Sequence, residues 1–193
     1  MATIVLQQTS LLLMLILATV ALDCGQIVQS QRNEIGRTRR LLEAMGGQRS
    51  PTECPEDPDF GFPMEKTVLN SNKEDARMAI GFFLEQIQTI FQHNYTQTNW
   101  NMTATDLFQE TLDQQQIQWQ RCSIVRTREQ ATRHGLHVKR TLKMYFTKLH
   151  IFLKEKEYSL CAWDAVRGEI FEVYSVNLQE RILNKGLHSR ADH

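Results

Sequence analysis

The sequence predicts an all-α fold, and three observations support that prediction. Proline is confined to one short stretch of the 193-residue chain, so no proline interrupts a helix elsewhere. Several segments repeat apolar residues at the spacing of an amphipathic helix, and no stretch alternates apolar and polar residues as a half-buried strand does. We therefore expect five main helices and no sheet. The prolines are Pro51, Pro55, Pro58 and Pro63.

The clearest of these helices covers about 73–92. Its apolar residues follow i, i+3, i+4, i+7 spacing, which places them on one face of the helix. Phe82 points away from that stripe, and we expect its ring to face solvent or a partner. An earlier helix spans about 31–45 and ends at the pair Gly46-Gly47. The stripe of the clearest helix consists of Ile80, Phe83, Leu84, Ile87, Ile90 and Phe91.

Three more helices follow in the second half of the chain. One begins near Asn101 or Thr103, either of which can cap its first turn, and continues through Trp119. The next contains residues 138–153, and the last runs from Trp163 to about residue 183. Apolar residues at helical spacing mark all three: Phe108, Leu112 and Trp119; Val138, Leu142, Tyr145, Phe146, Leu149, Phe152 and Leu153; Trp163, Val166, Ile170, Val173 and Tyr174.

Two connections between these helices are long, at about 46–72 and 123–133. Short loops make consecutive helices antiparallel, whereas long loops allow a helix to cross over and run parallel to the one before it. We therefore expect a four-helix up-up-down-down core with long crossover loops plus one extra helix. That topology is typical of cytokine bundles.

The first 21 residues have the pattern of a secretory signal peptide. An almost unbroken apolar run over 11–17 is followed by small residues at the −3 and −1 positions, Thr19 and Ala21. A membrane anchor is the alternative, but spanning a bilayer takes about 20 apolar residues. We expect a signal peptide, 1–21, and one secreted, extracellular helical domain, 22–193.

Charge and cysteine content narrow the classes of partner and site. The chain has 22 basic and 22 acidic residues and a formal net charge of zero, so no overall attraction to nucleic acid or to an anionic membrane is expected. An even number of cysteines in a secreted chain predicts two disulfides. A metal site is the alternative, but the chain lacks the C-x-x-C pair in which such ligands usually come. Three pairings of the four cysteines remain open at this stage: Cys24, Cys54, Cys122 and Cys161.

The sequence carries no motif for catalysis or for binding a cofactor. G-x-G-x-x-G, P-loop, G-x-S-x-G and H-E-x-x-H patterns are all missing. His134 and His137 have the spacing of two metal ligands, but no carboxylate or cysteine completes a set, so we expect them to be solvated. The basic run Arg37, Arg39 and Arg40 is either a processing site or, as we expect, a charged helix face. No enzymatic activity, cofactor or metal is predicted.

Two asparagines lie in N-x-T sequons. These are Asn94-Tyr95-Thr96, between two helices, and Asn101-Met102-Thr103, at the entrance to the next helix. Exposed sequons in a secreted protein accept N-glycans. We expect glycans at Asn94 and Asn101, the alternative being an unused sequon.

Two stretches resemble the type I interferons in detail. Residues 50–54 (SPTEC) followed by 59–63 (DFGFP) are similar to the family's loop after the first helix. Residues 153–170 (LKEKEYSLCAWDAVRGEI) are similar to its signature running into the last helix, and CAW followed by VRxEI is highly specific. Residues 177–180 (NLQE) fit as well, so the resemblance covers nearly the whole mature chain.

The resemblance implies a disulfide pairing. Cys24–Cys122 and Cys54–Cys161 are the pairs of the alpha, omega, tau and delta interferons. The second pair would pin the Pro-rich loop to the start of the last helix. Loop and helix would then form one preorganised surface, which lowers the entropy cost of docking.

The resemblance also implies receptor contacts. In the family this surface binds the high-affinity receptor chain, and the opposite face binds the low-affinity chain. Carried over by position, Arg167, Gly168 and Phe171 belong to the first face, and Lys143 and Phe82 to the second. Arginine suits a hot-spot role because its planar fork holds several directed hydrogen bonds.

The implied function is that of a secreted, monomeric antiviral cytokine of innate immunity. It would bring together the two chains of the type I interferon receptor and trigger JAK-STAT signalling. The chain departs from the family pattern at two places on one face: residues 55–59 are acidic and one residue shorter, and Glu172 stands where many members carry a base. A weak or decoy ligand, or a specialised helical hormone with little antiviral activity, would share the same fold.

Overall fold

The computed structural model describes residues 24–46, 54, 58–63, 73–93, 95, 98–124 and 133–174. Within these ranges it forms helices and no strands, as predicted. The predicted signal peptide and the chain beyond residue 174 lie outside the described residues. The helices are α2 (Cys24–Met45), α3 (Lys73–Phe91), α4 (Met102–Ile124), α5 (Arg133–Glu155) and α6 (Leu160–Glu172).

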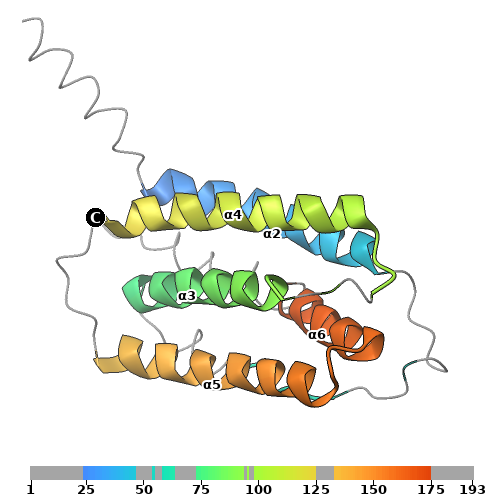
Figure 1. Ribbon diagram of the computed structural model, residues 1–193. Helices are drawn as coiled ribbons and strands as arrows, with labels where there is room; N and C mark the ends of the chain where they lie inside the picture. Colours follow the sequence, from blue (N-terminus) through green and yellow to red (C-terminus); the bar gives the residue numbers. More distant parts are fainter. Residues whose placement is uncertain are drawn as a thin grey trace, which may run out of the picture.

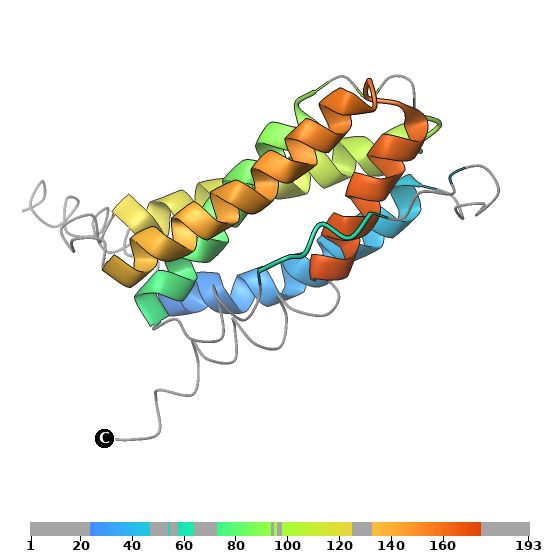
Figure 2. The same cartoon turned by 90° about the horizontal axis from the view of Figure 1, so that it is seen from below.

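The helix directions agree with an up-up-down-down core plus one extra helix. In Figure 1, α2 and α3 run from left to right, and α4 returns from right to left. The short helix α6 also runs leftwards, at an angle to the others, as Figure 2 shows from below. The remaining helix, α5, runs parallel to α2 and α3. It carries the chain from the left end of α4 to the right end of the bundle, where α6 begins, and so completes the second crossover.

Helix boundaries differ from the predicted ones mainly at the outer ends. α2 begins at Cys24, seven residues before the expected start; residues 24–30 contain no proline to end the helix. α3 begins at Lys73 as expected. α4 begins after Asn101, whose Oδ1 accepts a hydrogen bond from the amide of Ala104 at 3.1 Å, which confirms the predicted cap. The backbone of Val173 after α6 is still helical, and the predicted extension to 183 lies outside the described residues.

One large apolar core lies between the helices. Aromatic rings fill much of it: the Phe91 ring lies 4.8 Å from that of Phe108 and 5.8 Å from that of Trp163, centroid to centroid. Each fully buried side chain of this size contributes about 1.5–3 kcal/mol relative to an exposed one. The helical stripes predicted from apolar periodicity therefore face a common centre. The largest fully buried side chains include Trp163, Tyr174, Phe83, Phe91, Phe108 and Phe146.

The prediction that Phe82 faces solvent or a partner is wrong. Its side chain is 9% exposed and belongs to a second apolar cluster between α3 and α5 with Ala79, Val138 and Leu142. The ammonium group of Lys139 lies 5.1 Å above the centre of its ring. α3 packs against both α4 and α5, so its buried arc is wider than the single stripe that the periodicity indicated.

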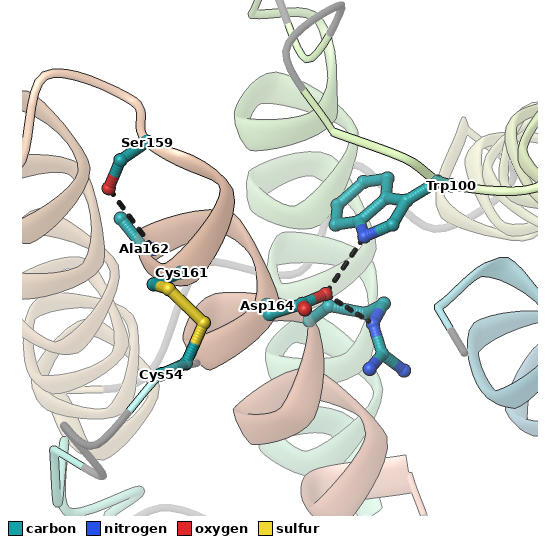
Figure 3. Close-up of a disulfide and its surroundings, with 7 residues drawn as sticks. Cys54, Trp100, Ser159, Cys161, Ala162 and Asp164 are labelled. Carbon is teal, nitrogen blue, oxygen red and sulfur yellow. Dashed lines mark hydrogen bonds and ion pairs between the residues drawn. A yellow bond between two sulfur atoms is a disulfide. The ribbon is translucent and has the colours of Figure 1, made fainter. Parts of the chain in front are cut away.

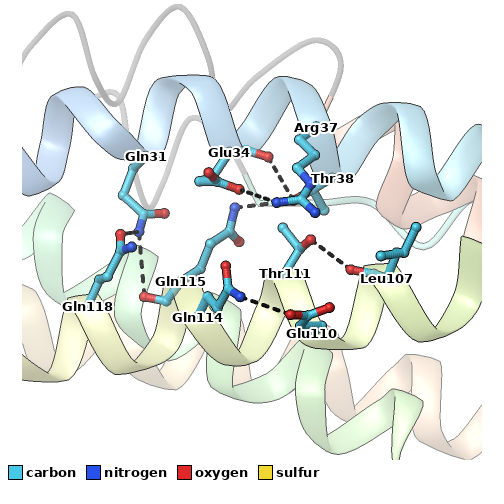
Figure 4. A network of polar contacts seen from close by, with 10 residues as sticks. All are labelled: Gln31, Glu34, Arg37, Thr38, Leu107, Glu110, Thr111, Gln114, Gln115 and Gln118. Carbon is cyan, nitrogen blue, oxygen red and sulfur yellow. Dashed lines mark hydrogen bonds and ion pairs between the residues drawn. The ribbon is translucent and has the colours of Figure 1, made fainter.

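The interface between α2 and α4 is polar at its centre (Figure 4). The buried Gln115 side chain donates from Nε2 to Oγ1 of Thr38 at 3.1 Å. Gln31, also buried, donates from Nε2 to Oε1 of Gln118 at 3.2 Å. Sliding one helix along the other would break these bonds, and each buried polar group left unpaired costs about 1–3 kcal/mol. This polar pairing therefore fixes the register of α2 on α4.

Candidate functional site

The candidate site is built on α6, the helix that carries the family-like signature. Two other segments meet it: the described part of the 46–72 connection, and the C-terminal end of α2. We name the surface formed by the outer side of α6, residues 58–63 and the end of α2 the α6 face. Figure 3 shows the side chains at the start of this helix.

A disulfide joins the connection to the helix. Cys54 bonds to Cys161, 107 positions later in the sequence, with their Cα atoms 5.3 Å apart. The Cys54 side chain is buried, so the bond is covered by protein on one side. The structure thus contains the bond that the resemblance implies. The side chains of Cys24 and Cys122 are outside the description, so their pairing remains a prediction.

The turn that leads into α6 has an unusual backbone. Glu157 and Tyr158 have φ angles of 51° and 55°, a left-handed conformation that costs a non-glycine residue about 1–2 kcal/mol. The neighbours hold this turn: the amide of Tyr158 donates to the carbonyl of Leu153 at 2.8 Å. Ser159 then caps the helix, its Oγ accepting from the amide of Ala162 at 3.4 Å. The direction in which α6 leaves the corner is therefore set by local bonds.

Contrary to the prediction, Arg167 does not lie on the surface. Its side chain is buried, and its Nη1 donates to the backbone carbonyl of Leu42 at 2.8 Å. Its Nε pairs with Oδ1 of Asp164 at 3.3 Å. The last four carbonyls of a helix have no intrahelical partner, and Leu42 is among the last four residues of α2. Arg167 therefore caps the C-terminal end of α2, where a positive charge also interacts favourably with the helix dipole.

Other groups complete the joint between α2 and α6. The amide of Asn101 donates to the carbonyl of Met45, the last residue of α2, at 2.8 Å. The indole Nε1 of Trp100 donates to the same Asp164 oxygen that pairs with Arg167, at 2.9 Å. The residue after α2 is Gly46, and a Cβ placed there would lie 2.4 Å from the guanidinium carbon of Arg167. A larger residue at this position would push the guanidinium group out of its present place.

Residues 58–63 pack against α5 and α3. Phe60 packs edge-on against the ring of Phe152 at 5.1 Å, and Phe62 packs edge-on against Tyr145 at 5.1 Å. Between them Gly61 has a φ of 64°, and its amide donates to Oδ1 of Asp59 at 2.8 Å. Glycine adopts this positive φ without the steric cost that a side chain brings. The turn directs the two rings inward, so this segment contributes mainly backbone and Asp59 to the surface.

The remaining predicted contacts divide between two sides of the molecule. On α6, Gly168 and Phe171 are half-buried, and a Cβ at Gly168 would meet nothing within 4 Å. Lys143 is exposed on α5. Phe82 lies beneath the surface of α5, in the cluster described above. The structure thus brings Gly168 and Phe171 together on the α6 face and places Lys143 on a separate helix.

Sequence reasoning missed the acidic residues that hold α6. The phenol of Tyr145 on α5 donates to Oε1 of Glu169 at 2.8 Å. Burial, with Glu169 close by, raises the pKa of Tyr145 well above its usual range, so the phenol stays a donor. Asp164 pairs with both Trp100 and Arg167. The i, i+3 spacing of Asp164 and Arg167 was the one available sign of these roles.

No group of three or more metal-binding side chains occurs within the described parts of the chain. His137 is exposed and His134 half-buried at the first turns of α5. Of the two sequons, Asn101 is exposed, and Asn94 lies outside the described residues. Arg39 and Arg40 are exposed on α2, where Arg37 pairs at 3.9 Å with Glu34, as expected for a charged helix face.

The chain is similar to known interferons in sequence and in structure. Interferon alpha-21 of Homo sapiens is 32% identical over 80% of this chain and 85% of its own length. Interferon tau-2 of Bos taurus is 34% identical over 76% and 88%. Zebrafish interferon 2 superposes with a TM-score of 0.64 at 28% identity, covering 75% of this chain and 94% of its own. Residues 27–182 match the interferon alpha/beta domain, and the protein therefore belongs to the type I interferon family of antiviral cytokines.

Proposed function

We propose that the protein is secreted after removal of residues 1–21 and acts by bridging the two chains of the type I interferon receptor. Bridging would bring the receptor-bound kinases together and start JAK-STAT antiviral signalling. The described residues include no helix that is both long and apolar enough to cross a membrane. The observation that carries the proposal is the preorganised α6 face in a chain of this family.

The α6 face suits the high-affinity receptor chain because its backbone is already ordered. The Cys54–Cys161 bond, the Ser159 cap and the Arg167 contact to α2 join three segments. A surface ordered before docking loses less conformational entropy on binding. Gly168, Phe171 and the exposed Glu172 are its outward residues, whereas Arg167 acts on binding by positioning α6.

The second contact would use α5, on the far side of α3 from α2 (Figure 1). Lys143 is exposed near the middle of this helix, and the exposed Met144 lies beside it. Phe82 supports this surface from below through its contact with Lys139. Two separated faces are what a ligand needs to hold two receptor chains at once.

The charge of the α6 face bears on how well the protein would signal. Asp59 and Glu172 are exposed acids on this face, and Glu172 stands where many relatives carry a base. A rim charge acts mainly on the association rate. Poor association would leave the protein a weak or decoy ligand, or a hormone with little antiviral activity.

The test measures binding and signalling separately. Each purified receptor chain from the source species is immobilised, and the mature protein is passed over both, while an antiviral reporter is read on cells. Binding to both chains with reporter activation is expected. Glu172→Arg should bind the high-affinity chain as well or more tightly, with the gain lost at high salt. Binding to one chain alone without reporter activity would replace bridging with the decoy function.

We also propose N-glycans at Asn94 and Asn101. The Oδ1 of Asn101 caps α4 and the residue is exposed, so its amide nitrogen is the atom left for a glycan. Enzymatic deglycosylation of protein from mammalian cells should lower its mass by two glycan units, and Asn101→Gln should remove one of them. An unchanged mass after deglycosylation would contradict the proposal.

A further inference from the structure

Helix α5 carries an excess of positive charge in a chain that is neutral overall. It has six Lys or Arg residues and one acidic residue, Glu155. In α3, α4 and α6, by contrast, acidic residues outnumber basic ones. Helix α2 also has more basic than acidic residues, but its excess is smaller than that of α5. The net charge of zero therefore hides an uneven distribution of charge among the helices, with the largest positive excess on α5. The six cations are Arg133, Lys139, Arg140, Lys143, Lys148 and Lys154.

Five of the six cations share one side of the helix. At about 100° per residue, all except Lys148 fall within an arc of about 120°. All five are exposed. From Arg133 to Lys154 the arc extends for about 32 Å at 1.5 Å per residue. We name these five residues the α5 basic stripe: Arg133, Lys139, Arg140, Lys143 and Lys154.

The stripe faces outward from the edge of the bundle. α5 packs mainly against α3 and α6, and in Figures 1 and 2 its other side is not covered by any described helix. Among the described residues no carboxylate forms an ion pair with the stripe. The one described contact of a charged group in the stripe is a cation–π contact, between the ammonium group of Lys139 and the ring of Phe82.

This arrangement weakens the fold slightly. Lys139 and Lys143 are four residues apart, and Arg140 and Lys143 are three apart, so like charges are neighbours on the helix surface. Each such pair destabilises a helix by a small amount. Placing the bases among the acids of the other helices would have avoided this, so the concentration of charge points to an anionic partner.

We propose that the α5 basic stripe binds a linear sulfated polysaccharide of the cell surface or extracellular matrix. A straight row of cations matches a chain that carries anionic groups at short intervals, and release of counterions drives such binding. The choice of an extracellular polyanion rests on the secretion included in the proposed function. The binding itself does not depend on the receptor.

The stripe is less suited to other polyanions. Single-stranded nucleic acids are held by several exposed aromatic side chains between the cations, whereas the exposed residues of α5 include no Phe, Tyr or Trp and one ring only, that of His137. A helix bound to an anionic membrane inserts its apolar face, whereas the apolar face of α5 is buried in the core. Only isolated apolar side chains, Leu136, Met144 and Ile151, are exposed on the helix.

Binding there would leave the α6 face open. Lys143 belongs both to the stripe and to the proposed contact with the low-affinity receptor chain. A polysaccharide on α5 would therefore retain the cytokine near cells and allow the high-affinity chain to bind. It would have to leave α5 before the second chain docked.

The test uses immobilised heparin and no receptor, so its failure is separate from failure of the proposed function. The mature protein should bind in about 0.15 M NaCl, with an affinity that falls steeply and linearly in log–log form as salt rises. Arg140→Ala/Lys143→Ala should weaken binding by about tenfold or more. The matched control, Arg39→Ala/Arg40→Ala, removes the same charge from exposed positions on α2 and should change binding less than about twofold.

Three competing probes identify the partner: desulfated heparin, duplex DNA and phosphatidylserine vesicles. All three should compete with immobilised heparin far less well than free heparin does. Equal losses of heparin affinity in the two double variants would show that binding responds to overall charge. That result would overturn the assignment of the binding site to the α5 basic stripe. Competition by DNA or vesicles as strong as that by heparin would overturn the assignment to a sulfated polysaccharide, and no binding at about 0.15 M NaCl would overturn both.

Discussion

Removing the Arg167 side chain tests whether this residue contacts a receptor or holds the fold together. In the structure its guanidinium group links α6 to the carbonyl of Leu42 on α2, 125 residues earlier in the sequence, and pairs with Asp164. Arg167→Ala would leave the Leu42 carbonyl unsatisfied and remove one of the two described partners of the Asp164 carboxylate.

The cost can be worked from these contacts. A hydrogen bond from a charged group contributes about 1.5–3 kcal/mol, and a cation at a helix C-terminus about 0.3–1 kcal/mol. Trp100 still donates to Asp164, which limits the cost of leaving that carboxylate without its cation. We expect a loss of about 2–4 kcal/mol in the free energy of unfolding. In a domain of this size that lowers Tm by about 5–15 °C.

Thermal unfolding and receptor binding should be measured on the same preparations. Arg167→Lys keeps the charge without the planar fork, so its Tm should lie between those of wild type and Arg167→Ala. Arg37→Ala, which removes a surface arginine paired at 3.9 Å, should change stability by less than about 1 kcal/mol. If Arg167→Ala unfolds at the wild-type temperature and yet fails to bind the high-affinity receptor chain, Arg167 is a contact residue and the positioning role is wrong.

Three further perturbations follow from the packing. Gly81→Ala should lower the free energy of unfolding, measured with urea, by about 1–3 kcal/mol, because the new Cβ would lie 2.5 Å from Cδ1 of Trp119. Gly168→Ala should raise it by about 0.5–1 kcal/mol, because the space around Gly168 is open. If both changes stabilise the protein, the close approach of α3 to Trp119 is not as described. Burial and the nearby His93 lower the pKa of His150 in the folded state, so the unfolded state binds more protons and stability falls as pH drops below about 6.5. His150→Gln should flatten this part of a pH series of urea midpoints, and the same slope in wild type and variant would contradict the assignment. The Cys54→Ser/Cys161→Ser variant should lose about 2–5 kcal/mol and bind the high-affinity receptor chain more weakly, whereas unchanged binding would show that the α6 face does not need the pinned segment.

Prediction from sequence worked where the signal is local. Apolar spacing along α3 and α5 depends on residues within two turns, and the structure confirms both helices close to their predicted starts. The Asn101 cap also depends on neighbours within one turn and was predicted correctly. Predicting the helix directions required only the lengths of the connections between the helices.

Prediction failed where burial depends on more than one neighbour. A periodic stripe indicates one buried direction per helix, but α3 has α4 on one side and α5 on another, which buries Phe82. Arg167 was expected on the receptor face because the resemblance to the family placed it there by position. Its partner carbonyl at Leu42 belongs to a helix that no local pattern connects with α6.

The sequence by itself determined the all-α class, the helix order, the family and the residues of the CAW–VRxEI signature, because each is written in local spacing or in contiguous residues. The tertiary structure alone decided that Arg167 caps α2, that Asp164 joins Trp100 to Arg167, and that five cations of α5 face outward together. These properties depend on which helices pack side by side. That packing arises from contacts between residues far apart in the chain. Spacing within one segment places residues on a common side of a helix, but it does not tell which side another helix covers.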